Sequence, residues 1–264
     1  MARISVPAFR ARKEQAEKLA VLTAYDFPSA QILDAHGVDA ILVGDSCAMT
    51  VMGRANTLGM TMDEMVHHVR MVASGAARAL VIADMPFLSY HVSPEEAVHN
   101  AGRLVAEGGA QAVKLEGPPG IFTSTITAIR NASIPVMGHL GLTPQSIHML
   151  GGYKVQGRDA QSRDAILEAA KGLDELGCFG IVLECVTADL AAEITEAVSC
   201  PTIGIGAGAE CDGQVLVLHD ILGWGFTRFT KTFSDVKSAV EAGVSAYVGE
   251  VKAGTFPAKE HEFE

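Results

Sequence analysis

The chain has 264 residues, of which 48% are hydrophobic and 19% are charged, and it contains 27 glycines. This composition excludes a disordered chain, because it supplies a large apolar core and many tight turns. The formal net charge of −11 argues against a nucleic acid as partner, because the chain would repel a phosphate backbone.

Short apolar runs alternate with amphipathic stretches of about 10 to 17 residues, a pattern typical of repeated β-strand and α-helix units around a parallel sheet. Residues 1–18, MARISVPAFRARKEQAEK, predict a leading helix. Strands are then expected over 19–24, 40–44, 79–84, 111–116, 134–139, 180–184, 201–206 and 226–230. Helices are expected over 28–36, 61–75, 94–107, 120–131, 161–176, 188–198, 213–222 and 234–253.

Eight strands, each followed by a helix, predict an α/β fold of the (β/α)8 TIM-barrel type, which typically takes about 250 residues. No segment rich in proline or serine divides the sequence, so residues 1–264 are expected to form a single domain. In that domain, residues 1–18 form the N-terminal helix and residues 234–264 form the C-terminal helix and tail. The segments 46–60 and 140–159 lack periodicity and follow strand ends, which favours loops over the barrel mouth.

Five apolar runs of strand length stop on a carboxylate, namely Asp26, Asp45, Asp84, Glu116 and Glu184. The carboxyl ends of parallel strands are where barrels place their chemistry. Several acids at one mouth would repel one another, which predicts a bound cation or raised pKa values. The alternative for each acid is a structural role as the N-cap of the next helix.

The spacing of these acids suits a Mg²⁺ ion, which takes oxygen ligands and usually only one or two protein carboxylates. Asp45 and Asp84 terminate consecutive units and would point toward one place, and Glu116 would reach the metal directly or through water. Lys114 lies two residues before Glu116 and is expected on the same side of its strand. A lysine in such an apolar run needs an anion, either a substrate or a structural carboxylate partner.

Two further polar residues end strands on the other side of the predicted mouth. His139 would donate a hydrogen bond to a substrate carbonyl or enolate, unless it is a satisfied core histidine. Desolvation would raise the pKa of Glu184, which would then act as a general base, unless it forms a structural salt bridge.

The five cysteines, Cys47, Cys178, Cys185, Cys200 and Cys211, are odd in number and show no CxxC or zinc-site spacing. They predict reduced thiols in a cytoplasmic protein. Cys47 lies beside Asp45 but has no visible activating partner, so a buried apolar role is favoured over a catalytic one. No apolar run of about 18 or more residues is present, so no membrane partner is expected.

Several segments together resemble the ketopantoate hydroxymethyltransferase family, in order along nearly the whole chain. The most specific are GHLGLTPQS (138–146) and GGYKVQGR (151–158). The others are TAYD (23–26), LVGDS with MT (42–50), ADMPF (83–87), VKLEG (113–117), LECV (183–186), IGIGAG (203–208) and the tail GTFPAKEHEFE.

The resemblance implies a (β/α)8 barrel of the phosphoenolpyruvate mutase and isocitrate lyase superfamily, assembled as a homodecamer. It implies transfer of a hydroxymethyl group from 5,10-methylenetetrahydrofolate to 3-methyl-2-oxobutanoate, through an enolate stabilised by one Mg²⁺ per subunit. The product is 2-dehydropantoate, or ketopantoate, for pantothenate and coenzyme A synthesis.

Carried over by motif, the resemblance implies a role for each polar residue of the predicted mouth. Asp45, Asp84 and Glu116 resemble the metal ligands, and Glu184 resembles the proton acceptor. Contacts to the 2-oxo acid are implied for Asp45, Ser46, Asp84 and Lys114, with His139 also in the active site. Asp26 is left with a structural role.

The chain departs from the family over 222–233, LGWGFTRFTKTF, next to the predicted eighth strand. One alternative is another Mg²⁺-dependent 2-oxo acid lyase or mutase of the same superfamily, but the KKCGH-type motif of the lyases is absent. The other is a non-catalytic barrel that only binds metal or small acids, which the loss of an acid would favour.

Overall fold

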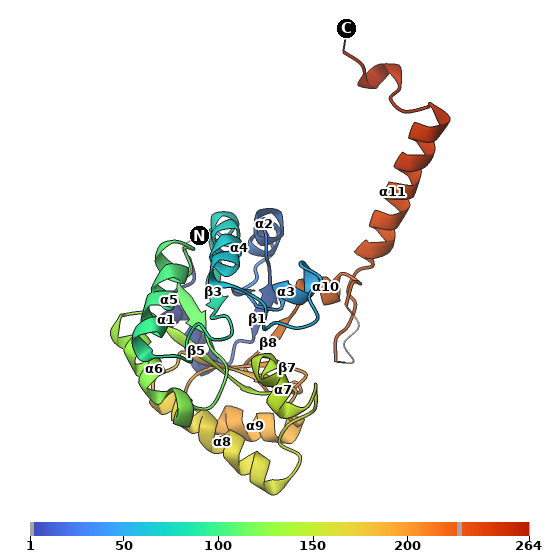
Figure 1. The fold of residues 1–264 in the computed structure, drawn as a ribbon. Helices are drawn as coiled ribbons and strands as arrows, with labels where there is room; N and C mark the ends of the chain where they lie inside the picture. The colour runs from blue at the N-terminus through green and yellow to red at the C-terminus, as the bar shows by residue number, and fades with distance from the viewer. Residues whose placement is uncertain (1–2, 226–228, 264) are drawn as a thin grey trace. The chain divides into compact units, whose positions relative to one another are not determined.

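The computed structural model describes residues 3–225 and 229–263. Eight parallel strands form a closed barrel in sequence order, with β1 paired to both β2 and β8 (Figure 1). This confirms the predicted (β/α)8 fold. The strands are β1 (Leu19–Thr23), β2 (Ala40–Val43), β3 (Leu80–Asp84), β4 (Ala112–Lys114), β5 (Val136–Gly141), β6 (Gly180–Glu184), β7 (Thr202–Ile205) and β8 (Gly213–Leu216).

The helices between successive strands include two packed pairs, α2 against α4 and α5 against α6. The helices of the described residues are α1 (Val6–Glu14), α2 (Phe27–Ala35), α3 (Cys47–Thr50), α4 (Met62–Gly75), α5 (Pro94–Ala106), α6 (Pro119–Asn131), α7 (Ile147–Leu150), α8 (Ala160–Glu175), α9 (Ala188–Ala197), α10 (Leu218–Ile221) and α11 (Val236–Ala253). Two short 3-10 helices are η1 (Pro144–Ser146) and η2 (Lys259–His261).

Local sequence signals account for several helix starts. Ser93 caps α5, and its hydroxyl accepts a hydrogen bond from the backbone N–H of Glu96. Thr61 and Glu64 form a reciprocal capping box at α4, which satisfies two backbone donors at once. These caps fix where each helix leaves the loop at the carboxyl end of the preceding strand, and therefore hold those loops in place.

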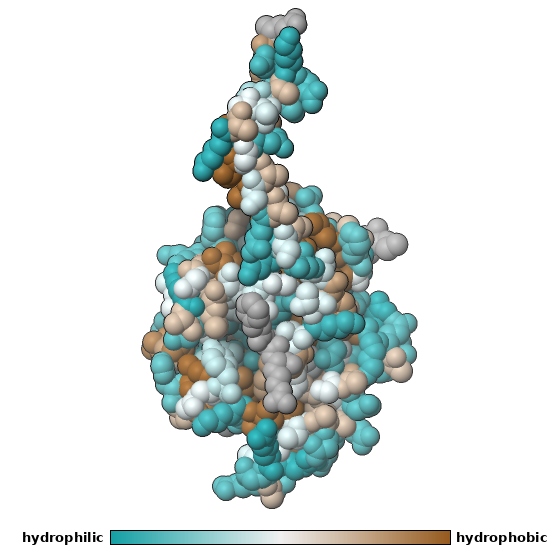
Figure 2. Space-filling view, turned by 90° about the vertical axis from the view of Figure 1, so that its right-hand side faces the viewer, coloured by the Kyte–Doolittle hydropathy of each residue, from teal (hydrophilic) through white to brown (hydrophobic). Residues whose placement is uncertain are grey.

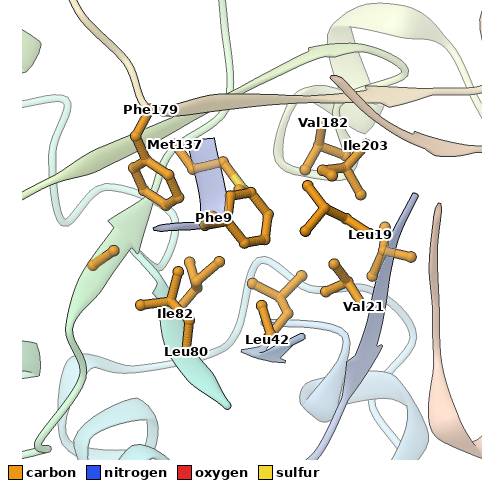
Figure 3. Packing of buried hydrophobic residues seen from close by; sticks show 13 residues of the cluster. Phe9, Leu19, Val21, Leu42, Leu80, Ile82, Met137, Phe179, Val182 and Ile203 are labelled. Carbon is orange, nitrogen blue, oxygen red and sulfur yellow. The ribbon is translucent and has the colours of Figure 1, made fainter. Parts of the chain in front are cut away.

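The predicted leading helix is present as α1, and it closes the barrel end opposite the carboxyl ends of the strands. Phe9 of α1 is fully buried and packs among residues at the beginnings of strands, with Phe179 edge-on at 5.8 Å between ring centroids (Figure 3). Leu19 and Leu80, the first residues of β1 and β3, belong to the same apolar cluster. The interior is therefore a packed core and not a pore.

The eighth strand is not where the sequence pattern suggested. The predicted helix over 213–222 is wrong, because residues 213–216 form β8 and only Leu218–Ile221 are helical. Gly213 explains the difference: a Cβ there would lie 2.5 Å from the carbonyl oxygen of Leu19, so only glycine allows β8 to approach β1. The eighth barrel strand is β8 and not the segment 226–230 expected for it, of which residues 226–228 lie outside the described residues.

The chain divides into two compact units, Met1–Val217 and Leu218–Glu264. The first contains all eight barrel strands, and the second contains α10, α11 and η2. The predicted C-terminal helix is present as α11, and none of its described residues is buried. Among the described residues, no helix is long and apolar enough to cross a membrane.

Candidate active site

The predicted acids gather at the carboxyl ends of neighbouring strands. Asp84 and Glu184 are the last residues of β3 and β6, whereas Asp45 and Glu116 follow β2 and β4 by two residues. Asp45, Asp84 and Glu116 are each at most 4% exposed. Carboxylates are almost never buried without partners, so these acids are expected to share a positively charged partner and to affect one another's pKa values.

Lys114 is the ammonium group that these acids share. Its Nζ lies 2.8 Å from Asp84 Oδ1 and 3.7 Å from Glu116 Oε1, and it donates a hydrogen bond to His139 Nδ1 at 3.1 Å. Lys114 and Glu116 therefore face the same side, as the strand period predicted. Burial by itself lowers the pKa of Lys114, but attraction to Asp84, Glu116 and Asp45 outweighs it, so the pKa is raised and the lysine stays charged.

His139 lies within β5 rather than at its end, and it is neutral. Burial and the charge of Lys114 lower its pKa to about 4. An ammonium group can only donate, so His139 Nδ1 accepts and the ring proton lies on Nε2. Nε2 donates to the carbonyl oxygen of Leu142 at 2.9 Å and lies 3.4 Å from Glu184 Oε2. In this arrangement the N–H of His139 is directed to Leu142, so the predicted hydrogen bond to substrate would require this contact to change.

Glu184 has the properties of a general base. Burial raises its pKa to about 7, so that a carboxylate becomes able to take a proton at neutral pH. Its backbone carbonyl accepts a hydrogen bond from Leu142 N at 2.8 Å. The next residue, Cys185, has a φ of +48°, and its carbonyl accepts from Gln156 N at 2.8 Å. A non-glycine residue in the left-handed region is uncommon and clusters at functional sites.

Asp45 and Asp84 are joined through the backbone, because Asp45 N donates to Asp84 Oδ2 at 3.1 Å. A Cβ on Gly44 would lie 2.8 Å from Ser46 Oγ and 3.4 Å from Asp84 Oδ2, so glycine permits this close approach. Burial, followed by the charge of Asp84, raises the pKa of Asp45 to about 7. Burial also raises the pKa of Glu116 to about 7.

The donor set fits a hard divalent cation. Asp45, Asp84 and Glu116 offer only oxygen, and Asp84 Oδ1 accepts no hydrogen bond from the described residues besides its ion pair with Lys114. Within the described residues, no group of three or more His, Cys, Asp or Glu side chains forms a ready-made metal cage. A Mg²⁺ site needs only one or two protein carboxylates, since waters and substrate oxygens complete it.

Of the remaining residues considered from the sequence, Ser46 lies at the site, whereas Asp26 and the cysteines have structural roles. Ser46 accepts or donates a hydrogen bond at 2.9 Å with the hydroxyl of Tyr25. Asp26 is exposed and caps α2 by accepting from Ser29 N at 2.8 Å, which is the structural alternative. Cys47 is buried, and burial raises the pKa of its thiol to about 12, so it does not supply a thiolate. All five cysteines are free and buried.

A hydrogen bond joins the segments 46–60 and 140–159. Tyr153 follows Gly151 and Gly152, which have φ of +66° and +115°, and its hydroxyl donates to Met49 Sδ at 3.8 Å. Burial raises the pKa of Tyr153, and the charge of Glu184 adds to this effect. The exposed ring therefore lies within electrostatic reach of the acids, as a lid residue would.

Two buried polar residues of the site did not emerge as site residues from the sequence. Gln145 contacts the side chains of Asp45, Glu116 and Tyr90, and Tyr90 in turn hydrogen bonds the backbone of Glu116. Gln145 belongs to the segment GHLGLTPQS, and a long amide in a loop after a strand end was a usable signal. Tyr90 lies in a loop between Asp84 and α5, and no pattern in the sequence marked it.

Comparisons with known proteins agree along the whole chain. The model of the ketopantoate hydroxymethyltransferase family matches residues 3–259. A protein of Syntrophomonas wolfei named 3-methyl-2-oxobutanoate hydroxymethyltransferase is 51% identical over 266 aligned positions, covering 100% of this chain and 96% of the relative. One of the same name from Clostridium novyi is 53% identical over 262 positions, covering 98% and 95%.

Solved structures with the same fold are more distant in sequence. A phosphonopyruvate hydrolase in complex with oxalate and Mg²⁺ aligns with a TM-score of 0.66 at 13% identity, covering 100% of this chain and 92% of the other. A 2,3-dimethylmalate lyase of the phosphoenolpyruvate mutase and isocitrate lyase superfamily aligns with a TM-score of 0.63 at 16% identity, covering 100% and 93%.

Proposed function

The chain belongs to the ketopantoate hydroxymethyltransferase family and is therefore an enzyme, and from this premise we propose its reaction and the residues that perform it. It transfers a hydroxymethyl group from 5,10-methylenetetrahydrofolate to 3-methyl-2-oxobutanoate, which gives ketopantoate for pantothenate and coenzyme A synthesis. The observation that carries the assignment of roles is Glu184, a buried carboxyl with a pKa of about 7 beside a cluster of acids that has Lys114 as its shared cation.

Asp45 and Asp84 would hold a Mg²⁺ ion, with Glu116 as a third oxygen donor directly or through water. When bound, the ion supplies a Lewis acid that draws electron density from the 2-oxo acid and favours loss of a proton next to its carbonyl. The raised pKa values of Asp45 and Glu116 support this assignment, because a nearby cation would restore the charged form of both groups.

Glu184 accepts the proton from C3 of 3-methyl-2-oxobutanoate. Water takes the methylene carbon from the folate as formaldehyde, which breaks both C–N bonds and leaves tetrahydrofolate. The electron pair left at C3 then forms the new C–C bond to the formaldehyde carbon, and the formaldehyde oxygen takes up a proton to become the hydroxyl group of ketopantoate. A base with a pKa near the working pH combines a large deprotonated fraction with enough basicity, which suits this step.

Lys114 would hold the carboxylate of the 2-oxo acid, since its ammonium group stays charged among the acids and can donate a charge-assisted hydrogen bond to an anion. Ser46, which hydrogen bonds Tyr25, would contact the same substrate. Tyr153 and the glycines before it would cover the two bound substrates and limit access of water.

The decisive experiment incubates the protein with both substrates and Mg²⁺, and follows ketopantoate by mass spectrometry with and without a chelator. Product should form only when both substrates are present, and the chelator should suppress it. A cleavage product from the 2-oxo acid alone would instead favour a superfamily lyase. Binding without any product would favour the non-catalytic barrel.

The role of Glu184 has a separate test. Glu184→Gln should lower turnover by roughly 10²- to 10⁴-fold, the usual contribution of a positioned base, while metal-dependent binding of the 2-oxo acid persists. Glu196→Gln, which changes an exposed carboxyl on α9, is the matched control and should keep full activity. Undiminished deuterium exchange at substrate C3 in Glu184→Gln, measured by NMR, would contradict the assignment.

A further inference from the structure

We infer that Gln145 is a positioning residue that sets the orientation of the metal-side carboxylates from the loop after β5. It is 5% exposed, and it follows the carboxyl end of β5 in η1. Its backbone N–H donates to Glu116 Oε2 at 3.0 Å, and its side-chain Nε2 donates to Asp45 Oδ2 at 2.9 Å. One residue therefore holds two acids that follow different strands, β2 and β4.

The neighbours of Gln145 fix which way its amide points. Nε2 donates to Asp45 Oδ2 and to the carbonyl oxygen of Met85 at 3.0 Å, and that carbonyl oxygen can only accept. The other end, Oε1, accepts from the hydroxyl of Tyr90 at 2.7 Å, and that hydroxyl accepts from Glu116 N at 3.2 Å. A flipped amide would place its oxygen against the carbonyl oxygen of Met85, so this network favours one orientation of Gln145.

The hydrogen bonds from Gln145 also decide which carboxylate oxygens of Asp45 and Glu116 remain available to bind a metal ion. Gln145 donates to one oxygen of Asp45 and to one oxygen of Glu116, and so fixes the rotation of both carboxylates. Because an amide carries no charge, it orients these groups without neutralising them, unlike the ammonium group of Lys114. Hydrogen-bond partners behind metal-ligating carboxylates commonly raise affinity for the ion in this way.

The inference rests on the proposed function, because it assumes that Asp45 and Glu116 hold a divalent cation. The test is Gln145→Met, which keeps the length of the side chain and removes both amide hydrogen-bonding groups. Binding of Mn²⁺ is measured by electron paramagnetic resonance, and binding of Mg²⁺ by calorimetry, in the presence of 3-methyl-2-oxobutanoate and without folate. No turnover is needed, so the readout does not depend on activity.

Gln111→Met is the matched control, because the side-chain amide of Gln111 is also hydrogen-bonded at both ends, but Gln111 precedes β4 at the opposite end of the barrel. Its Oε1 accepts from Val81 N at 2.9 Å, and its Nε2 donates to Gly109 O at 2.7 Å. Both variants lose two side-chain hydrogen-bonding groups, which are buried at Gln145 and partly buried at Gln111, so both should lower the melting temperature. Gln145→Met alone should weaken metal binding, by about 10- to 100-fold.

Tyr90→Phe provides a second, milder variant, because it removes only the hydroxyl that holds Gln145 Oε1. It should weaken metal binding in the same direction and by less than Gln145→Met. If Gln145→Met binds Mn²⁺ within about twofold of the parent protein while its melting temperature falls as in Gln111→Met, Gln145 is merely structural and the inference is overturned.

The two proposals fail in different ways. A parent protein that binds Mn²⁺ but makes no ketopantoate would contradict the proposed reaction. The role of Gln145 would then be decided by the metal-binding data alone. A parent protein that makes ketopantoate but binds neither ion would overturn the inference about Gln145 and the metal assignment, but not the transfer of the hydroxymethyl group.

Discussion

Lys114 is shared among acids that burial alone would drive toward the protonated form. Its ammonium group lies 2.8 Å from Asp84 Oδ1 and 3.7 Å from Glu116 Oε1. A buried ion pair is not in itself strong evidence for stability, because desolvation of both charges opposes their attraction. Removing one partner is a different matter, because it leaves the other charges buried without compensation.

We therefore expect Lys114→Met to lower the free energy of unfolding by about 3 to 5 kcal/mol, the usual effect of breaking a buried pair. Urea denaturation monitored by circular dichroism gives this value. Lys171→Met is the control, because Lys171 forms its ion pair with Glu168 on the surface of α8. A Lys114→Met protein as stable as the control variant would mean that the acids do not depend on this lysine.

The raised pKa values give the metal-free protein an unusual dependence on pH. Asp45, Glu116 and Glu184 have folded pKa values of about 7, above the ordinary range of carboxyls, so between about pH 4.5 and 7 the folded state binds more protons than the unfolded state. Stability therefore falls as pH rises through this window. His139, with its pKa lowered to about 4, acts in the opposite direction but is one group against three.

The expected result is that, with a chelator present, the free energy of unfolding decreases from pH 5 to pH 7, and that Mg²⁺ reverses the loss at pH 7. Urea titrations across this range measure it. A ligand at 100 times its dissociation constant would restore about 2.7 kcal/mol. Stability that rises with pH in the chelated protein would show that these acids are charged throughout.

For individual residues, the sequence predicted which side chains lie at the site better than it predicted which atoms they contact. A carboxylate after an apolar run can be recognised, because its desolvation is costly in any barrel. The contact of His139 Nδ1 with Lys114 and the contacts of the Gln145 amide depend on how β4, β5 and the following loop meet, so the sequence did not predict these contacts. Asp26 shows the same limit, because capping and catalysis give the same local pattern.

Among the elements, the neighbouring strands β5 and β6 fix the base through their backbones. Gly141 ends β5 with a φ of +94°, and it pairs with Glu184 at the end of β6. A Cβ at this position would lie 2.2 Å from the carbonyl oxygen of Glu184. The glycine therefore allows the backbones of β5 and β6 to lie close together at this point. This close contact fixes the backbone position from which the Glu184 side chain extends.

Gly141→Ala should consequently lower both stability and activity, because a left-handed conformation alone costs about 1 to 2 kcal/mol for a residue with a Cβ. The clash with Glu184 adds to this cost. Gly120→Ala in α6 is the control, since a Cβ there meets nothing within 4 Å. That control should leave activity unchanged and raise stability by up to about 1 kcal/mol, the helix propensity difference. Equal activity of both variants would disprove the constraint.

Element prediction succeeded for runs with strong periodicity and failed where one segment fitted two patterns. Residues 213–222, GQVLVLHDIL, contain the apolar run 215–218, and periodicity cannot distinguish a buried strand from a helix in so short a run. The register of β8 against β1 resolves the ambiguity, and that register depends on residues far apart in the chain.

For the whole molecule, α11 is the element that most requires a partner. Its exposed apolar residues recur at helical spacing, and a single helix of this length is only marginally stable in water. Brown apolar patches interrupt the teal surface along α11 (Figure 2). The apolar residues are Val240, Val244, Tyr247, Val248 and Val251, all between 40% and 59% exposed. The homodecamer that the family resemblance implies would give this stripe a surface to cover it.

We expect the solution mass, measured by light scattering, to be a multiple of 27.7 kDa. Val244→Glu combined with Tyr247→Glu should lower that mass, because it places two charges on the apolar stripe. Ala242→Glu lies on the opposite side of the helix at about 100° per residue and should leave the mass unchanged. A monomeric parent protein would refute the predicted assembly.

The closure of the barrel between β1 and β8 has a consequence for synthesis of the chain. β1 is complete once Thr23 is made, but its second partner, Gly213–Leu216, follows almost all of the barrel sequence. Until then the nascent chain carries an unpaired strand edge and an open apolar interior, which are the features that invite aggregation. Final closure also waits on a contact between distant residues, so it should be slow compared with formation of the helices. During translation, this enzyme would be exposed to misassembly until β8 emerges from the ribosome.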